Sequence, residues 1–380
     1  MKWENGIIIT KFETGCRYRY FESYIKVWEI EKKPTLCQKM KQYASFTHLP
    51  FVSIVVAAYN SEVYIEKCLD SVLKLNYPQF EVIVVDGGSI DDTIHKIKLK
   101  IRTNQDKILL ICNKNLGVSA DRNVGIEASR GKYIFLLDAD TLVEKDSAKE
   151  LAQLMDADSK IGIAQPKILS LNGRKICNAG TQMDHYGWTF AAGTGENRWK
   201  YESPRELICA DTTAVLVRKS ILEKTGLFDE YFFYYYEATD LSYRIVVSGS
   251  KIVYWPKAVV RHKSGHVRKK KTLSWRLFSF NLYHLAFIVK NYKLKEIARF
   301  GFPVFLATVL SSLYFLLKRK ADVAISILKS TTVLVKEFKT IWSKHLFVSY
   351  RIRNTNGSNT SVPFSKSLWN LVMHDLKSLE

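Results

Sequence analysis

An apolar run between residues 131 and 141 ends in two acids that stand two positions apart. The run reads GKYIFLLDADT, and Asp138 and Asp140 follow its strand-like part. In an extended chain, residues two positions apart point to the same side. Two carboxylates that leave a buried strand together can bind a divalent cation, which in turn binds phosphate oxygens. An acidic turn that merely ends a strand is the alternative.

Three further strand-like runs precede this one, at residues 51–60, 80–86 and 107–112, and helical stretches separate them. This alternation predicts βαβ units and a parallel sheet covered on both faces. In such sheets, ligands bind outside the carboxyl ends of the strands. The groups expected at those ends are polar or acidic: Tyr59, Asn60, Asp86, residues 113–117, Asp138 and Asp140. No Gly-x-Gly-x-x-Gly follows the first strand, which disfavours a Rossmann dehydrogenase.

Several short motifs occur in an order that resembles the family 2 glycosyltransferases. They are Ala58–Asn60, Val85–Thr93, Asn115–Gly125 and Leu137–Asp140. Downstream, residues 226–244 resemble the acceptor-side motif of the rhamnosyltransferase-like branch, and residues 256–262 resemble the histidine-bearing strand that closes the site. The resemblance covers residues 50–265. It implies a GT-A fold, with a Rossmann-like mixed sheet, and inverting transfer of a hexosyl or deoxyhexosyl group from a nucleotide-diphosphate sugar.

The resemblance also implies roles for the strand-end residues on the donor side. Asp86 should contact the nucleobase, with Tyr59, Asn60 and Ser89 in the same donor-binding region. Arg122 and Asn123 should lie near the ribose and the diphosphate.

A metal site is implied as well. Asp140 should bind Mg²⁺ or Mn²⁺, with Asp138 on the ribose or the metal and His262 as a further metal ligand or a diphosphate contact. A metal and a guanidinium would neutralise the charge that develops on the leaving diphosphate.

The general base is where this sequence departs from the family pattern. Many relatives read Glu-Asp-x-Asp-Leu, and the Asp of the Glu-Asp pair is the usual base, but Ala238 stands there in this chain. Inverting transfer needs a carboxylate to take the acceptor proton. The two candidate catalytic acids are Glu237, which we favour as base, and Asp240, which would orient the loop or bind Arg244. A helix-start acid cluster without a catalytic role is the alternative. Asp121 is a second departure, since relatives usually have a small residue there.

The 380 residues carry a formal net charge of +20, which calls for an anionic partner. No nucleic-acid-binding motif is present, and the basic residues flank apolar helices instead. Residues 300–317 are free of charge, a basic cluster at 261–276 precedes them, and Lys318–Lys320 follows. This pattern predicts a monotopic or re-entrant anchor on an anionic membrane surface, with a single span or a buried core helix as alternatives.

The cysteines and the chain start bear on localisation. The six cysteines contain no Cys-x-x-Cys and read as reduced thiols, and residues 1–19 lack the apolar run of a signal peptide. Both features predict a protein on the cytoplasmic face of the cell membrane.

The expected layout has four parts: a basic extension at 1–48, a GT-A domain at 49–265, a helical membrane-associated region at 266–345 and a polar tail at 346–380. The favoured function is transfer of a sugar to a lipid-linked or surface polysaccharide acceptor. A polyprenyl-phosphate sugar synthase needs no general base and is the enzymatic alternative. A non-catalytic nucleotide-sugar-binding or glycan-binding relative is the other, motivated by Ala238.

Overall fold

The computed structural model describes residues 49–114, 116–263 and 271–353. The predicted extension at 1–48, the part of the predicted tail beyond residue 353, Asn115 and the basic residues 264–270 lie outside these ranges. The four cysteines within the described ranges, Cys68, Cys112, Cys177 and Cys209, are all free, whereas Cys16 and Cys37 lie outside.

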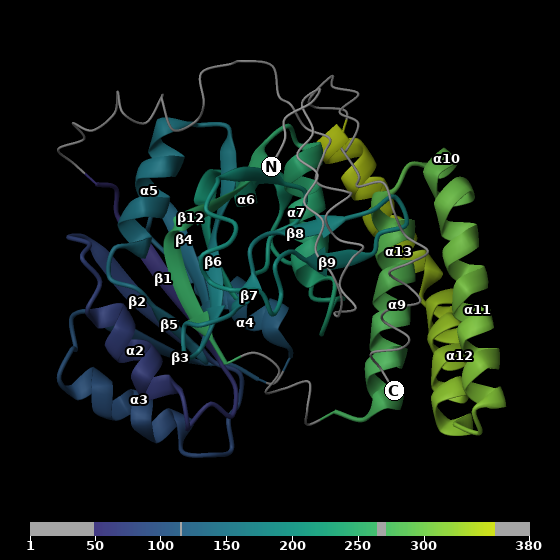
Figure 1. Cartoon of the computed structure of the whole chain (residues 1–380), viewed down its shortest axis with the longest axis horizontal. Helices are drawn as coiled ribbons and strands as arrows, with labels where there is room; N and C mark the ends of the chain where they lie inside the picture. The colour runs from purple at the N-terminus through teal and green to yellow at the C-terminus, as the bar shows by residue number, and fades with distance from the viewer. Residues whose placement is uncertain (1–48, 115, 264–270, 354–380) are drawn as a thin grey trace, which may run out of the picture. The chain divides into compact units, whose positions relative to one another are not determined.

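A mixed sheet forms the centre of the described part of the chain (Figure 1). Eight strands follow the order β10-β12-β6-β11-β4-β1-β2-β3, with β5 paired to β12 and β7 paired to β6. A separate two-stranded sheet consists of β8 (Thr181–Met183) and β9 (Thr189–Ala191). The strands of the main sheet are β1 (Val52–Ala58), β2 (Phe80–Asp86), β3 (Ile108–Cys112), β4 (Tyr133–Asp138), β5 (Thr141–Val143), β6 (Ile161–Ser170), β7 (Ile176–Asn178), β10 (Arg205–Leu207), β11 (Ala214–Arg218) and β12 (Lys251–His262).

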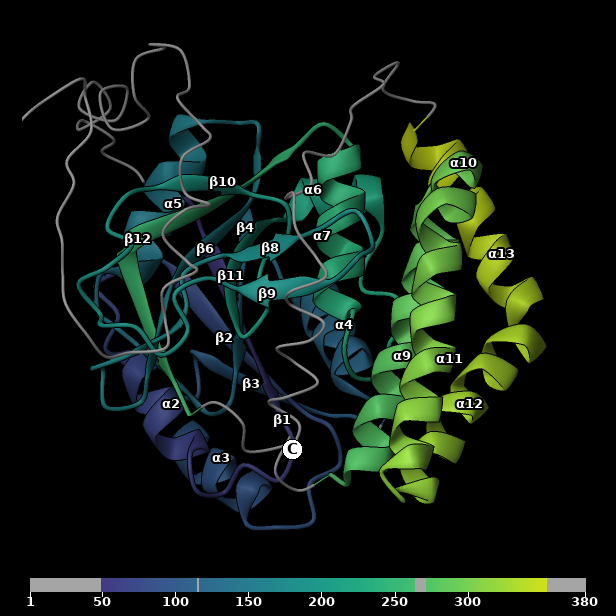
Figure 2. The same cartoon turned by 45° about the vertical axis from the view of Figure 1, so that its right-hand side comes forward.

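The first four strands are parallel, and their order creates a switch point. The chain moves outward from β1 to β2 and β3 and then returns to β4 on the other side of β1. Right-handed connections therefore place α2 (Ile65–Leu73) and α3 (Thr93–Arg102) on one face and α4 (Val118–Ala128) on the other (Figures 1 and 2). A ligand crevice is expected outside the strand ends at such a point.

The second half of the sheet is mixed in strand direction. Strand β11 runs antiparallel to β4 and β6, and the long strand β12 runs parallel to β6. The helices of this half are α5 (Ser147–Ala157), α6 (Lys219–Thr225) and α7 (Glu237–Val247), whose first residue is the candidate base.

Helix α9 (Leu273–Asn291) packs into the core rather than outside it. Its buried residues Leu285, Phe287 and Ile288 share one apolar cluster with Phe232 and Tyr236, which precede α7. The expected boundary at 265/266 therefore divides a continuous hydrophobic core. The helices that follow are α10 (Leu294–Glu296), α11 (Phe302–Leu317), α12 (Ala321–Lys336) and α13 (Phe338–Phe347), with π-helical turns at Ile297–Gly301 and Val348–Arg353.

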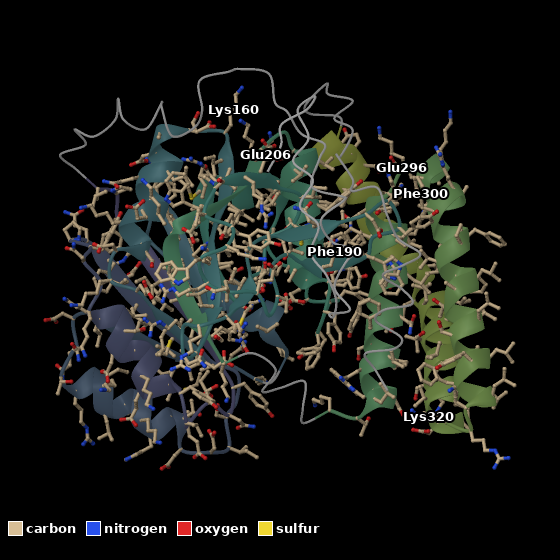
Figure 3. All side chains as sticks on the ribbon, in the orientation of Figure 1. Lys160, Phe190, Glu206, Glu296, Phe300 and Lys320 are labelled. Atoms are coloured by element: carbon tan, nitrogen blue, oxygen red, sulfur yellow. The ribbon has the colours of Figure 1, made fainter. Side chains whose placement is uncertain are left out.

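Residues Leu294–Leu317 form a helical run of 24 residues that is long and apolar enough to cross a membrane. Only 28% of its most apolar window is buried, so the run is not a core helix of the usual kind. Glu296 and Phe300 lie at one end of this run, and Lys320 lies just past its other end (Figure 3). Lys318, Arg319 and Lys320 are exposed there.

Candidate active site

The strand-end residues come together at the edge that the sequence predicts. Strand β1 lies between β2 and β4, and its register pairs Ala58 with Asp86 and Ala57 with Asp138. The two acids therefore flank the end of β1, where Tyr59 and Asn60 follow. The strands are apolar and β-branched where the sheet is buried, and polar side chains follow where each strand reaches this edge.

Asp86 organises the turn that follows β2. Its buried carboxylate accepts hydrogen bonds from the backbone N–H of Gly88 (3.0 Å) and Ser89 (2.8 Å), and from the Ser89 hydroxyl (2.5 Å). The Ser89 hydroxyl accepts a bond from the Asn60 N–H (2.8 Å), and the Asn60 side chain accepts one from Ile90 (2.9 Å). The turns after β1 and β2 are thus locked to each other, and Tyr59 beside them is 45% exposed.

Asp121, the second departure from the family pattern, is buried against this turn. Its Oδ1 accepts a hydrogen bond from Asn113 Nδ2 (3.0 Å), and a Cβ added to Gly87 would lie 2.4 Å from its Oδ2. Burial raises the pKa of Asp121 to about 6; the Asn113 hydrogen bond opposes this shift and the charge of Asp86 adds to it. Asn113 is thus a hydrogen-bond partner of Asp121, and the only signal for it in the sequence is its position directly after β3.

Asp138, Asp140 and His262 form a possible metal site. One ligand atom from each lies within 4.8 Å of the others, and His262 Nε2 is 3.3 Å from Asp140 Oδ1. Strand pairing explains this meeting, because β12 places His262 opposite Thr141 of β5, next to Asp140. Two carboxylates and an imidazole on one side fit a divalent cation such as Mn²⁺ or Mg²⁺.

The charges in this group adjust one another's protonation. Burial raises the pKa of Asp138 to about 6, with the Arg122 charge opposing and the Asp140 charge adding to the shift. Burial alone would lower the pKa of His262, but the hydrogen bond and charge of Asp140 outweigh it and hold that pKa above its usual value. The imidazole must lose its proton before it can bind a metal.

Arg122 connects this group to the start of α7. Its buried guanidinium lies 2.8 Å from Asp138 Oδ1 and 3.4 Å from Glu237 Oε1, and it donates to the Thr212 carbonyl at 3.3 Å. One cation from α4 therefore holds a strand-end acid and the first acid of α7 together.

Asn123 and Asp240 are placed differently from the rest. The Asn123 amide exchanges two hydrogen bonds of 3.0 Å with the Phe228 backbone and donates a third to Glu230, so it fastens the chain before α7. Asp240 is fully buried and binds Arg244 through Oδ2 (2.8 Å), which is one of the two roles expected for it. Of the two candidate acids, Glu237 alone contacts Arg122.

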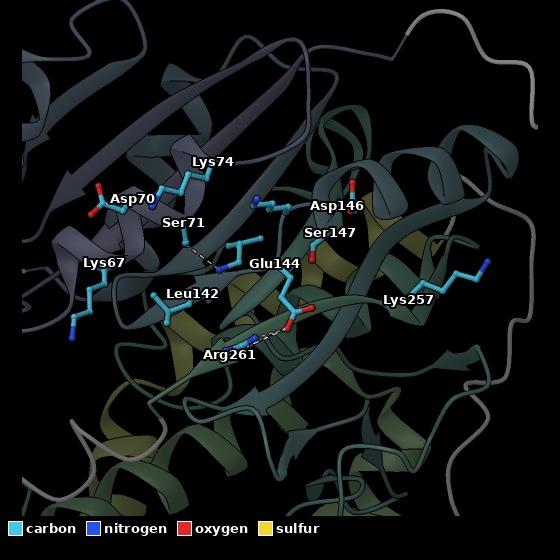
Figure 4. A pocket seen from close by; sticks show the side chains of 12 residues that line it. Lys67, Asp70, Ser71, Lys74, Leu142, Glu144, Asp146, Ser147, Lys257 and Arg261 are labelled. Carbon is cyan, nitrogen blue, oxygen red and sulfur yellow. Dashed lines mark hydrogen bonds and ion pairs between the residues drawn. The ribbon is translucent and has the colours of Figure 1, made fainter.

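Two cavities border β12. One of about 490 Å³ lies beside the possible metal site and is lined by Ser170, Leu171, Asn172, His262 and Lys263. The other, of about 740 Å³, lies between α2 and the β5–α5 connection and is lined by charged residues that include Arg261 (Figure 4). Lys67 and Lys257 point to opposite ends of this second cavity, so its cations do not converge on one point.

This mixed sheet, with a switch point beside β1 and an acid–acid–histidine group at the same edge, defines a GT-A fold. The sequence comparison agrees with this class. Residues 53–226 match the model of the family described as Glycosyl transferase family 2. The matched segment is thus similar to family 2 glycosyltransferases. The expected GT-A fold is confirmed.

Two curated relatives are similar over this segment. Poly-beta-1,6-N-acetyl-D-glucosamine synthase of Staphylococcus aureus (strain COL) is 32% identical over 148 residues, which are 39% of this chain and 34% of the relative. Chondroitin synthase of Escherichia coli is 34% identical over 121 residues, which are 31% of this chain and 18% of the relative. The chain thus spans about a third or less of these relatives, and the rhamnosyltransferase-like branch stays a prediction.

Two solved structures share the fold. GalNAc-T7 with UDP, GalNAc and Mn²⁺ superposes with a TM-score of 0.51 at 16% identity, over 68% of this chain and 55% of that one. TarS 1–349 of S. aureus with UDP-GlcNAc has a TM-score of 0.50 at 19% identity, over 79% of this chain and 91% of that one.

Proposed function

We propose that this protein is an inverting glycosyltransferase that moves a sugar from a nucleotide-diphosphate donor to a lipid-linked or surface glycan. The observation that carries the proposal is the convergence on Arg122 of Asp138, beside the possible metal site, and Glu237, on the acceptor side. A displacement at an anomeric carbon needs positive charge at the leaving group and a base at the entering group. Both requirements meet within this one group of residues.

The donor side would use the turn built on Asp86 for the base, with Tyr59, Asn60 and Ser89 around it, and Arg122 toward the diphosphate. Asp138, Asp140 and His262 would hold Mg²⁺ or Mn²⁺. A bound cation would supply positive charge to the leaving diphosphate. Glu237 would accept the proton of the acceptor hydroxyl, which compensates for Ala238 at the family's base position.

The experiment that tests this function is donor binding followed by product analysis. Calorimetry with UDP-, GDP- and dTDP-sugars, with and without Mn²⁺, should show binding that the metal tightens. UDP-N-acetylhexosamines come first, because a relative at 32% identity is named for an N-acetylglucosamine polymer. Transfer is then assayed by mass spectrometry with lipid-linked acceptors. Absence of donor binding would contradict the proposal, and donor binding without transfer to any acceptor would favour the non-catalytic alternative.

The acceptor chemistry separates the two enzymatic alternatives. A polyprenyl-phosphate acceptor is already ionised at neutral pH, so its glycosylation does not depend on a carboxylate base. A hydroxyl acceptor does depend on one. The contact between Glu237 and Arg122 favours the hydroxyl acceptor. It places a carboxylate in the site, and only a hydroxyl acceptor needs a carboxylate to accept its proton.

We also propose that α11 lies in the surface of an anionic membrane, on the cytoplasmic side. Exposed apolar side chains cover its outer face, among them Leu306, Leu310, Leu313 and Leu316. Exposed Lys318, Arg319 and Lys320 follow directly. An apolar helical face next to basic residues is typical of interfacial helices. A monotopic arrangement is favoured over a span because basic residues stand at both ends.

Replacing Leu306, Leu310 and Leu313 together by glutamate should abolish sedimentation with phosphatidylglycerol-containing liposomes. These residues are spaced i, i+4 and i+7 on one face, so the three charges would meet the lipid together. Leu109→Glu is the matched control, since Leu109 on the edge strand β3 is 51% exposed, as Leu310 and Leu313 are. Equal sedimentation of the triple variant and the unmodified protein would rule out this face as the membrane contact.

A further inference from the structure

Helix α7 rests on α9, a helix that begins 26 residues after α7 ends. The contact is partly apolar: Tyr236, Tyr243 and Val247 pack with Phe287 and other buried residues of α9. It is also ionic, and this ionic part is unusual for a protein interior. Charged side chains are almost never fully buried unless they are paired.

Lys290 is the centre of the ionic part. Its side chain is 5% exposed, and its Nζ lies 2.7 Å from both Asp229 Oδ2 and Asp240 Oδ1. The neighbouring Asn291 donates to the same Asp240 oxygen at 2.9 Å. Two consecutive residues at the end of α9 thus hold one carboxylate in the first turn of α7. Arg244 takes the other oxygen of that carboxylate.

The protonation of the pair fits a permanent ion pair. Burial alone would raise the pKa of Asp240, but the charges of Arg244 and Lys290 outweigh it and keep that pKa below its usual value. Buried ion pairs stabilise proteins weakly, because desolvation offsets most of the attraction. In some proteins such pairs instead fix the geometry of the elements that they join. The cluster is therefore better explained by its effect on the position of α7 than by its contribution to the stability of the fold.

The turn before α7 is strained and is held by the same helix. Tyr235 and Tyr236 have left-handed backbone angles, with φ of 73° and 63°, and Glu237 follows them. Two such residues in a row are strained and persist only where the surrounding structure enforces their conformation. The Tyr236 ring stacks on His284 of α9 with ring centres 5.2 Å apart, and its hydroxyl donates to the Gly187 carbonyl at 3.1 Å.

We propose that α9 positions the general base: Lys290 and His284 hold the first turn of α7 so that the Glu237 carboxylate stays beside Arg122. Lys290 is thus a positioning residue of the transfer reaction, although it lies in the stretch that the sequence assigned to membrane association. This inference rests on the proposed function, because it takes Glu237 as the base. Asp240 links Lys290 to Glu237, because it lies three residues after Glu237 in the same helix and pairs with Lys290.

The test replaces Lys290 by methionine together with Asp229→Asn, which removes one buried charge of each sign. We expect the rate constant kcat for transfer to fall by about 10- to 100-fold, the effect of displacing a reacting group by about 1 Å. The metal-dependent Kd for the donor should stay unchanged, since the donor turn does not touch this cluster. An unchanged kcat in the folded variant would overturn the proposal.

A control is offered by a second buried lysine with a carboxylate partner in the described part of the chain. Lys167 in β6 has a side chain that is 3% exposed and pairs with Glu202. Glu202 itself is exposed, so the double variant Lys167→Met/Glu202→Gln removes one buried charge; it should lower the thermal midpoint, yet change kcat by less than about twofold. A comparable fall of kcat in this control would show that loss of stability alone lowers the rate, and would overturn the positioning role.

A double-mutant cycle separates this inference from the proposed function. In a Glu237→Gln background the Lys290 and Asp229 changes should have no further effect on kcat, because the group that they position is gone. Additive losses would overturn the positioning role. Should Glu237→Gln alone leave transfer unchanged, the base assignment fails first, whatever Lys290 does.

Tyr236→Phe is a milder second variant that serves if the double variant does not fold. It removes the hydrogen bond to Gly187 and keeps the ring stacked on His284. We expect kcat to fall by about 3- to 10-fold, as for the loss of one hydrogen bond, and again only when Glu237 is present. An equal fall with and without Glu237 would overturn the proposal.

Discussion

Replacement of Glu237 by glutamine is expected to lower transfer to a hydroxyl acceptor by about 10²–10⁴-fold, the usual contribution of a positioned general base. The amide keeps the size of the side chain and can still accept a hydrogen bond from Arg122, so the fold and the donor site should survive. Donor affinity, measured by calorimetry with Mn²⁺, should therefore stay the same while kcat falls. Initial rates with the identified acceptor provide the measurement.

Two further variants make this result specific. Glu206→Gln, an exposed change in β10, should leave the rate unchanged. Ala238→Asp restores the residue that many relatives have at the base position; it should not raise the rate if Glu237 already serves as base. An unchanged rate in Glu237→Gln would show that Glu237 is not the general base. It would favour a polyprenyl-phosphate acceptor over a hydroxyl acceptor.

Replacement of Asp140 by alanine should abolish the dependence of donor binding on Mn²⁺ or Mg²⁺. Asp140 contacts His262 at 3.3 Å, and with Asp138 these residues form the one acid–acid–histidine group found among the described residues. Transfer should fall by about 10²–10³-fold, as when one preorganised charge-stabilising group is removed. Calorimetric titration of the donor with and without metal tests both parts.

The matched control for Asp140 is Asp146→Ala. Asp146 accepts a hydrogen bond from Asn76 Nδ2 at 2.9 Å and lines the cavity on the other side of β12. Its loss should change neither donor affinity nor the metal effect. If Asp140→Ala kept the metal dependence of the unmodified protein, the assignment of this group as the metal site would be wrong.

The donor half of the site could be predicted from the sequence because its signals are local. Strand β2 runs over Phe80–Asp86, as expected from its apolar residues, and Asp86 ends it. The acids of the strand after α4 likewise follow the last apolar residue of β4. Parallel strands then bring these ends to one edge without any further information.

The acceptor half could not be predicted in the same way, because its contacts join distant segments. Helix α9 has an apolar pattern flanked by basic residues, which fits a membrane helix as well as a core helix. Its role depends on what packs against it, and Lys290 meets Asp229 across 61 positions of sequence. Asn123 is similar: its side chain serves the turn at Phe228, 105 positions away, and no local pattern marks that contact.

The packing of α9 decides how a detergent-free form of this protein could be produced. Deleting everything after β12 would expose Phe287's neighbours on α7 to water and leave Asp240 without Lys290, so the remaining fragment should aggregate. Replacing the exposed apolar side chains on the outer face of α11 by polar ones leaves that core intact. Solubility engineering should therefore act on single surface positions and keep the chain at full length.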